Sequence, residues 1–133
     1  MQESGWPVIA AAISALLIGA VWYHPRVFGS LWMQGSGMTP EMAERGARYR
    51  HVHFILGFIA ALVAADVLRL LLRSLEIRDA FGAMHLALLI WIGFVVPVSA
   101  GALLWEHRSV KFYVLNICYW LVTLIVMSYV LVL

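Results

Sequence analysis

Charged side chains are scarce in this chain. Only 12% of its 133 residues are Asp, Glu, Lys or Arg, whereas a soluble domain has about 25%. Hydrophobic residues make up 64% of the chain, which is more than a soluble fold of this length can bury. The same composition excludes a disordered chain. We therefore interpret the protein as an integral membrane protein and do not expect a soluble enzyme.

Cysteine and excess positive charge are also nearly missing. Cys118 is the only cysteine, so an intrachain disulfide is excluded. Its apolar surroundings indicate a small buried side chain. Nine Lys and Arg residues against seven Asp and Glu residues give a net charge of +2, scattered along the chain. This excess is too small and too dispersed to predict a nucleic-acid partner.

The motifs of the common catalytic classes are missing too. The chain has no nucleophile elbow, Walker loop, zinc-protease helix or dinucleotide fingerprint. The sequence therefore gives no support for covalent catalysis or nucleotide hydrolysis, and we predict no cofactor.

What the sequence does contain is four long apolar stretches. They cover about 6–23, 52–72, 80–105 and 112–133. Each meets or approaches the ~20 residues with which a helix crosses a bilayer. The alternation typical of membrane strands is not visible. We predict an all-α fold, in which residues 1–133 form one integral membrane bundle of four transmembrane helices.

The connection between the first two stretches is the only long one. Pro25 is expected to end the first helix. Residues 39–41, Thr-Pro-Glu, predict a later helix start with the threonine as its cap. Between these points, four apolar residues at helical spacing predict a short segment lying in the membrane interface: Val27, Phe28, Leu31 and Trp32.

The other connections are short and predict antiparallel helix hairpins, one around residues 73–79 and one around 106–111. Pro97 removes a backbone hydrogen bond and predicts a kink in the third helix. Small residues recur at four-residue spacing and predict close helix packing. These stripes are Ala11, Ala15 and Gly19; Gly57, Ala61 and Ala65; and Gly93, Pro97 and Gly101.

The distribution of basic residues predicts the orientation. The first and third connections share one membrane side and carry Arg26, Arg45, Arg48, Arg50, Arg108 and Lys111. The opposite side has Arg69, Arg73 and Arg78 near its only loop. By the positive-inside rule we place the first and third connections in the cytoplasm and both termini outside.

Two segments are more distinctive than their composition. Residues 19–33 read GAVWYHPRVFGSLWM, and residues 93–97 (GFVVP) are followed by LWEHR at 104–108. Together they resemble the bacterial membrane family called domain of unknown function 1761. That family has a Trp-Tyr-x-Pro-x-x-Phe-Gly-x-x-Trp-Met segment after its first span and a Leu-Trp-Glu-x-Arg segment closing its third. This chain has His24 where serine is expected and Ser109 where proline is expected.

The resemblance covers nearly the whole chain and implies four spans with one long first connection. It implies no activity, since none is established for the family. It also implies a bacterial inner-membrane location.

The predicted topology brings polar and aromatic residues to one membrane side. This candidate functional cluster comprises Trp22, Tyr23, His24, Pro25, Phe28, Trp32, His51, His53, Trp105, Glu106, His107 and Arg108. Glu106 has two interpretations: it pairs with a basic residue such as Arg26 or Arg108, or it accepts a proton or holds a ligand. The four histidines and Glu106 form a weak metal-ligand set, because residues 51 and 53 point to different sides of a helix. We predict no metal.

Three ionisable residues fall inside or near the ends of the apolar stretches. Asp66 and Arg69 are three residues apart and can pair on one helix face, and His85 lies near the same membrane side. Intramembrane ionisable groups are candidates for function, although a salt-bridged pair is a purely structural alternative. Polar residues on the last helix either form interhelical hydrogen bonds or line a small cavity: Asn116, Tyr119, Trp120 and Thr123.

Three functional hypotheses follow. The first is a homo-oligomeric channel or transporter-like protein for a small solute or ion. Asp66 and Glu106 are then the ionisable groups along its pathway, near opposite membrane sides. The second is an accessory protein that recognises membrane lipid or a partner membrane protein through residues 22–33 and 105–108. The third is a membrane enzyme in which Glu106 and a nearby histidine transfer protons.

Overall fold

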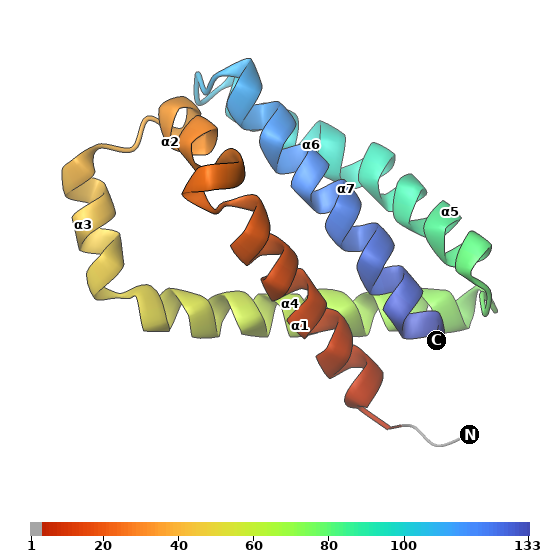
Figure 1. Ribbon diagram of the computed structural model, residues 1–133. Helices are drawn as coiled ribbons and strands as arrows, with labels where there is room; N and C mark the ends of the chain where they lie inside the picture. The colour runs from red at the N-terminus through yellow and green to blue at the C-terminus, as the bar shows by residue number, and fades with distance from the viewer. Residues whose placement is uncertain (1–3) are drawn as a thin grey trace.

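The computed structural model describes residues 4–133, and within this range every regular element is a helix (Figure 1). In chain order these are α1 (Trp6–Trp22), η1 (Pro25–Gly29), α2 (Ser30–Ser36), α3 (Pro40–Arg48), α4 (Arg50–Ser74), α5 (Ala80–Ile90), η2 (Trp91–Val95), α6 (Val96–Leu104) and α7 (Val110–Val132). The predicted all-α helical bundle is confirmed.

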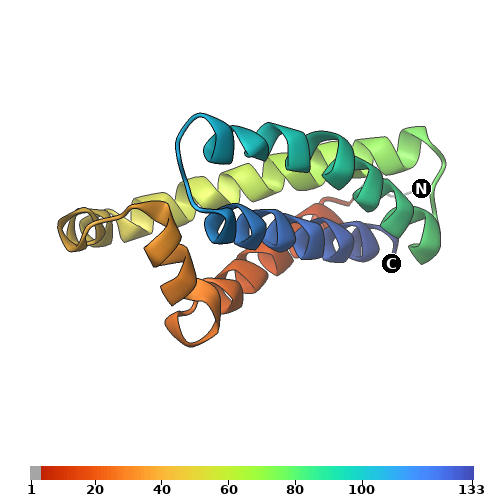
Figure 2. The same ribbon diagram turned by 90° about the horizontal axis from the view of Figure 1, so that it is seen from above.

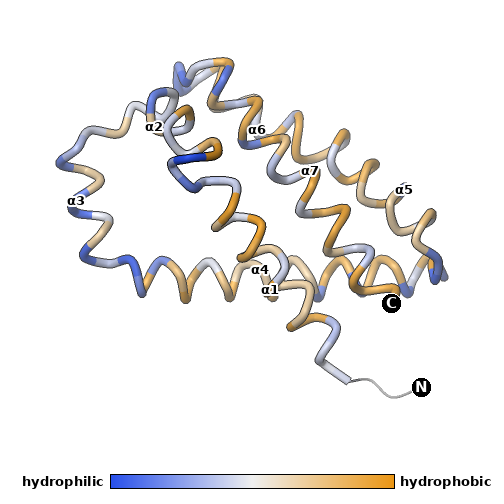
Figure 3. The backbone as a smooth tube through the Cα atoms, viewed as in Figure 1, coloured by the Kyte–Doolittle hydropathy of each residue, from blue (hydrophilic) through white to orange (hydrophobic). Residues whose placement is uncertain are grey.

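Three of the helical segments are long and apolar enough to cross a membrane: α4, the continuous run from Ala80 to Leu104, and α7. The 17 residues of α1 are joined to the 25–36 segment across a bend of 49°, and together they give a fourth candidate span. Figure 3 shows that the middle of the helices is hydrophobic, while hydrophilic residues gather at the turns and along α3. These features identify a membrane protein of three or four spans.

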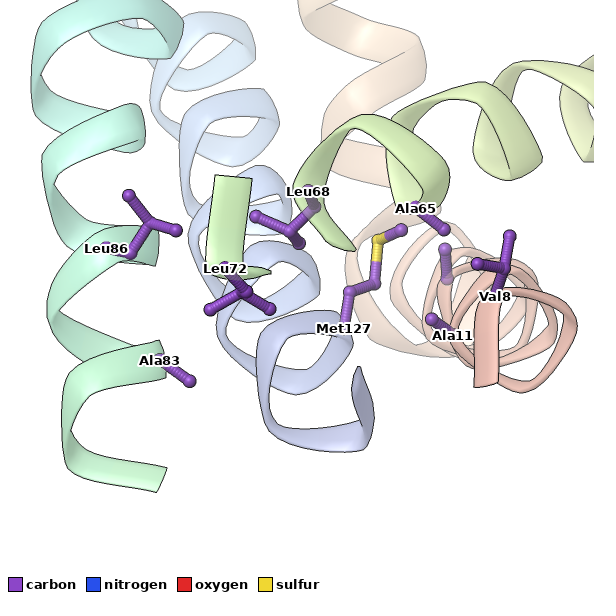
Figure 4. Packing of buried hydrophobic residues seen from close by; sticks show 9 residues of the cluster. Val8, Ala11, Ala65, Leu68, Leu72, Ala83, Leu86 and Met127 are labelled. Carbon is purple, nitrogen blue, oxygen red and sulfur yellow. The ribbon is translucent and has the colours of Figure 1, made fainter. Parts of the chain in front are cut away.

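Helix α7 lies at the centre of the bundle. Helices α1 and α2 pack against it, as do α5 and α6 (Figures 1 and 2). Helix α4 instead runs across α1 and the C-terminal part of α7. The core forms where these helices meet, with Met127 of α7 between α1 and α4 (Figure 4). Its other members are Val8, Ala11, Ala15, Ala65, Leu68, Leu72, Ala83 and Leu86.

Small residues determine the partner of α4. Ala11 and Ala65 are fully buried, and Ala15 is nearly so. Their small side chains let the backbones of α1 and α4 approach closely. Helix α4 therefore packs on α1 and separates from α5 beyond the turn that joins them. The predicted antiparallel hairpin of the second and third stretches is wrong beyond that turn, whereas α7 packs on both α5 and α6 as predicted.

The first half of α4 extends beyond the core. Nearly all of residues 50–60 are exposed, and a side chain added at Gly57 would meet no atom within 4 Å. Helix α3, capped by the Thr39 hydroxyl as predicted, connects this half of α4 to α2. The early part of α4 is thus held away from the α6–α7 turn (Figure 1).

Pro97 changes the helical register locally. The ring of a proline clashes with the carbonyl four residues earlier, and its nitrogen has no hydrogen to donate. Here the five residues before Val96 form a π-helical turn, in which the Val96 N–H donates to the Trp91 carbonyl. A π-bulge thus precedes the position of the predicted Pro97 kink, within a continuous 25-residue span.

Candidate functional site

The main candidate site is a groove at one end of α7, which we call the aromatic groove. Its volume is about 690 Å³. The end of α1, the η1–α2 segment, α6 and α7 all contribute to it. It is lined by Tyr23, Pro25, Gly29, Ser30, Trp32, Met33, Ser99, Phe112, Asn116, Tyr119 and Trp120.

The wall of the groove depends on an unusual turn after α1. His24 Nδ1 accepts a hydrogen bond from the Arg26 N–H at 3.1 Å and so caps the π-helical segment η1. The Gly29 N–H donates to the His24 carbonyl at 3.0 Å. A side chain at Gly29 would collide with the Tyr23 carbonyl oxygen, so this tight turn needs glycine.

Helix α2 then docks directly on the start of α7. A Cβ atom at Gly35 would lie 2.5 Å from Ser109 Oγ and 2.7 Å from Phe112 Cβ, so the two helices touch there. Arg108 donates to the Ser36 carbonyl and lies over the Phe112 ring. Ser109 caps α7 by accepting a hydrogen bond from the Phe112 N–H. The η1–α2 segment is thereby held over the groove.

A hydrogen-bonded pair forms the polar floor of the groove. The Tyr23 hydroxyl donates to Asn116 Oδ1 at 2.8 Å. Within the described residues the amide nitrogen of Asn116 has no hydrogen-bond partner, so its two N–H donors are available. The Tyr119 hydroxyl donates to the Ala15 carbonyl at 3.3 Å. Polar groups with hydrogen-bonding capacity thus lie among the aromatic residues that line the groove.

The rings form one connected cluster. The Tyr23 ring lies 5.9 Å from that of Trp32 and 5.2 Å from that of Tyr119. The Trp32 ring lies 6.0 Å from that of Phe112. These separations fall in the range for stabilising aromatic pairs. Trp22 contacts the Tyr119 ring at 6.5 Å and donates from its indole nitrogen to the Leu115 carbonyl. The aromatic walls are therefore fixed by mutual contact.

A smaller hollow of about 340 Å³ adjoins the aromatic groove. The two share Ser99, Phe112 and Asn116. Glu106 and Trp105 line its outer part, and 81% of the Trp105 surface is exposed. No described histidine lines this hollow with Glu106.

The structure brings part of the predicted cluster together. Tyr23, Pro25 and Trp32 line the groove. Trp22 and Phe28 do not line it but contact each other, with ring centroids 4.6 Å apart. Arg108 fixes the end of α2 through the Ser36 carbonyl. His51 and His53 are exposed on the outlying half of α4 and line none of the three hollows described. His107 lies exposed in the α6–α7 turn with a φ of 55°. Among residues 4–133 no group of three or more His, Cys, Asp or Glu side chains is placed to hold a metal ion.

The intramembrane ionisable residues lie elsewhere. Asp66 and His85 are exposed on the outside of α4 and α5. Arg69 donates to the Ser4 carbonyl at 3.0 Å. Thr123 is completely buried inside the bundle, whereas Asn116 and Tyr119 from the same predicted face line the groove. None of the three hollows described is lined by both Asp66 and Glu106.

Apart from residues within 22–33, two residues of the groove were not predicted from the sequence: Ser99 and Phe112. Phe112 lies one turn before Asn116, so its spacing on α7 was a usable signal. Ser99 follows the π-bulge, whose extra residue shifts the register of α6. Its position could not be read from regular helical periodicity.

The comparisons with known proteins identify the family. The family described as "Protein of unknown function (DUF1761)" matches residues 6–132. The chain belongs to this family. No curated protein and no solved structure matches it. The DUF1761 match includes both the residues of the aromatic groove and those of the α6–α7 turn, so the groove lies within the family region.

Proposed function

We propose that this DUF1761 protein is a membrane-embedded binding protein. Its ligand is a lipophilic molecule with an oxygen that accepts hydrogen bonds, bound in the aromatic groove. The observation that carries the proposal is the hydrogen-bonded Tyr23–Asn116 pair, which lines a groove whose other lining residues include several aromatic rings. An apolar pocket with few convergent polar groups is the usual form of a small-molecule site.

Volume and chemistry agree with this proposal. Ligand pockets measure about 300–1,000 Å³, and the aromatic groove has about 690 Å³. Stacked rings favour flat or extended apolar groups. The Asn116 amide favours a carbonyl, ether or hydroxyl oxygen.

A channel or transporter-like role needs more than one copy of the chain. The apolar core around Ala11, Ala65 and Met127 lies between the groove and the opposite end of α7. Asp66 faces away from that core. A path past Asp66 would therefore run between subunits, and this role remains the alternative to a binding function.

Native mass spectrometry of protein released gently from membranes tests the binding proposal. We expect the wild-type chain to keep a small-molecule adduct. Trp32→Ala is expected to weaken its retention about tenfold, as is Asn116→Leu, because each removes a contact made only in the groove. Trp32→Phe, which keeps a ring, is expected to retain the adduct.

The matched control is Phe94→Ala, which removes an aromatic side chain that is 68% exposed and lies outside the groove. It should leave the adduct unchanged. A wild-type chain that is bare in every mild detergent contradicts the proposal. So does a wild-type chain whose every adduct is retained fully by both Trp32→Ala and Asn116→Leu.

A further inference from the structure

A third hollow lies at the other end of the bundle, beside the start of α1 and the end of α7. Its volume is about 550 Å³, and the start of α1, the end of α4, the α4–α5 turn and the end of α7 contribute to it. Three arginines line it: Arg69, Arg73 and Arg78. Glu76 is the one acidic residue among its described lining residues. Counted over the described lining residues alone, the hollow has an excess of two positive charges.

Helical spacing and one turn bring the arginines together. Arg69 and Arg73 are four residues apart on α4 and so share a face. After α4 ends, the Ile77 N–H donates to the Leu72 carbonyl at 2.8 Å. Glu76 adopts a left-handed φ of 57° in this turn. The chain therefore folds back at once, and Arg78 returns to the hollow that the other two arginines line.

The Glu76 conformation is unfavourable for a residue with a side chain. Glycine is the usual residue at this position of a helix-ending turn, because a Cβ atom is strained at positive φ. Here a carboxylate occupies the position and lines the hollow with the arginines. A charged group kept in a strained backbone conformation is typical of a functional site.

The remainder of the hollow is apolar. Pro7, Leu72, Leu131 and Val132 line it beside the arginines. Both α4 and α7 are candidate spans that end there. Arginine groups beside apolar walls at the ends of spans lie where lipid phosphates meet acyl chains.

We propose that this hollow binds the phosphate of an anionic glycerophospholipid. The guanidinium groups of the three arginines hold the phosphate oxygens, and the acyl chains lie along Leu72 and Leu131. Arg69 uses one N–H on the Ser4 carbonyl, and a guanidinium has five such donors. Its planar fork suits a phosphate better than an ammonium group does. This site is separate from the aromatic groove and does not depend on the function proposed for it.

Titration of the delipidated full-length protein in detergent, followed by native mass spectrometry, tests the proposal. Three probes are compared: phosphatidylglycerol, phosphatidylcholine and free glycerol phosphate. We expect phosphatidylglycerol to bind at least about tenfold more tightly than the other two, since it combines a net negative charge with acyl chains. Equal affinity for glycerol phosphate would identify a soluble phosphate ligand and overturn the lipid assignment.

Single substitutions locate the site. Arg73→Gln and Arg78→Gln are each expected to weaken phosphatidylglycerol binding about tenfold, because each removes a charge-assisted hydrogen-bond donor. Arg45→Gln, on the exposed last turn of α3, is the matched control and should have no effect. If Arg45→Gln weakens phosphatidylglycerol binding as much as the other two substitutions do, the lipid responds to the overall positive charge of the protein and not to this hollow. The proposal is then wrong. Trp32→Ala should retain phosphatidylglycerol, which separates this test from that of the aromatic groove.

Discussion

His24 illustrates how one side chain determines a local structure beside the groove. It replaces the serine expected from the family resemblance, yet it still caps the following turn through Nδ1. We expect His24→Ala to lower the free energy of unfolding in mixed micelles by about 1 kcal/mol, which is typical of a lost cap. His24→Ser should retain most of the stability, because serine is a good capping residue.

The matched control for this prediction is His53→Ala, since His53 is exposed on α4. Its unfolding free energy should be close to that of the wild-type chain. If both alanine variants lose the same stability, the capping explanation of His24 is wrong. Ser109 parallels His24, because it replaces an expected proline and caps α7. Both departures from the family pattern thus keep a helix start in place.

At the scale of elements, the contact between α2 and α7 holds the α2 residues that line the aromatic groove in place. Gly35 allows this contact, since any Cβ atom there would overlap the Phe112 side chain. We expect Gly35→Ala to destabilise the protein by about 1–3 kcal/mol, the usual cost of overpacking. The measurement is again unfolding in mixed micelles.

Gly46→Ala is expected to have the opposite effect on the free energy of unfolding in mixed micelles. Gly46 lies inside α3 with no atom within 4 Å of an added Cβ. Alanine there should stabilise the protein by up to about 1 kcal/mol, because glycine disfavours helix. A Gly35→Ala variant that behaves like Gly46→Ala would show that α2 does not pack on α7 in solution.

The same elements show what the sequence could predict. Apolar length, the Thr39 cap and the spacing of Phe28 and Trp32 were local signals, and each gave an element correctly. The stripes of small residues predicted close helix packing but not which helices pair, so the direction of α4, which follows from the packing of Ala65 on α1, was not predicted. This direction separates His51 from Trp32. Consequently the aromatic part of the site was predictable from the sequence, whereas the set of residues surrounding it was not.

At the scale of the whole molecule, one chain leaves an extensive apolar surface on α4. Phe54, Ile55 and Ile59 are exposed there, and Gly57 leaves room for another helix. Asp66 is also exposed further along the same helix. Ionisable side chains within spans almost always face a bundle interior or a partner group. We therefore predict a homo-oligomer in which α4 of one copy packs against another copy.

Cross-linking in native membranes and native mass spectrometry check this prediction. With Cys118 replaced by serine, Gly57→Cys should form disulfide-linked dimers, whereas Phe94→Cys, on an exposed face of η2, should not. Gly57→Leu should shift the oligomer towards monomer, because a bulky side chain blocks close helix approach. A wild-type monomer with equal cross-linking at both positions would contradict the α4 interface. It would also remove the intersubunit path past Asp66 that a channel requires, leaving the binding function as the consistent alternative.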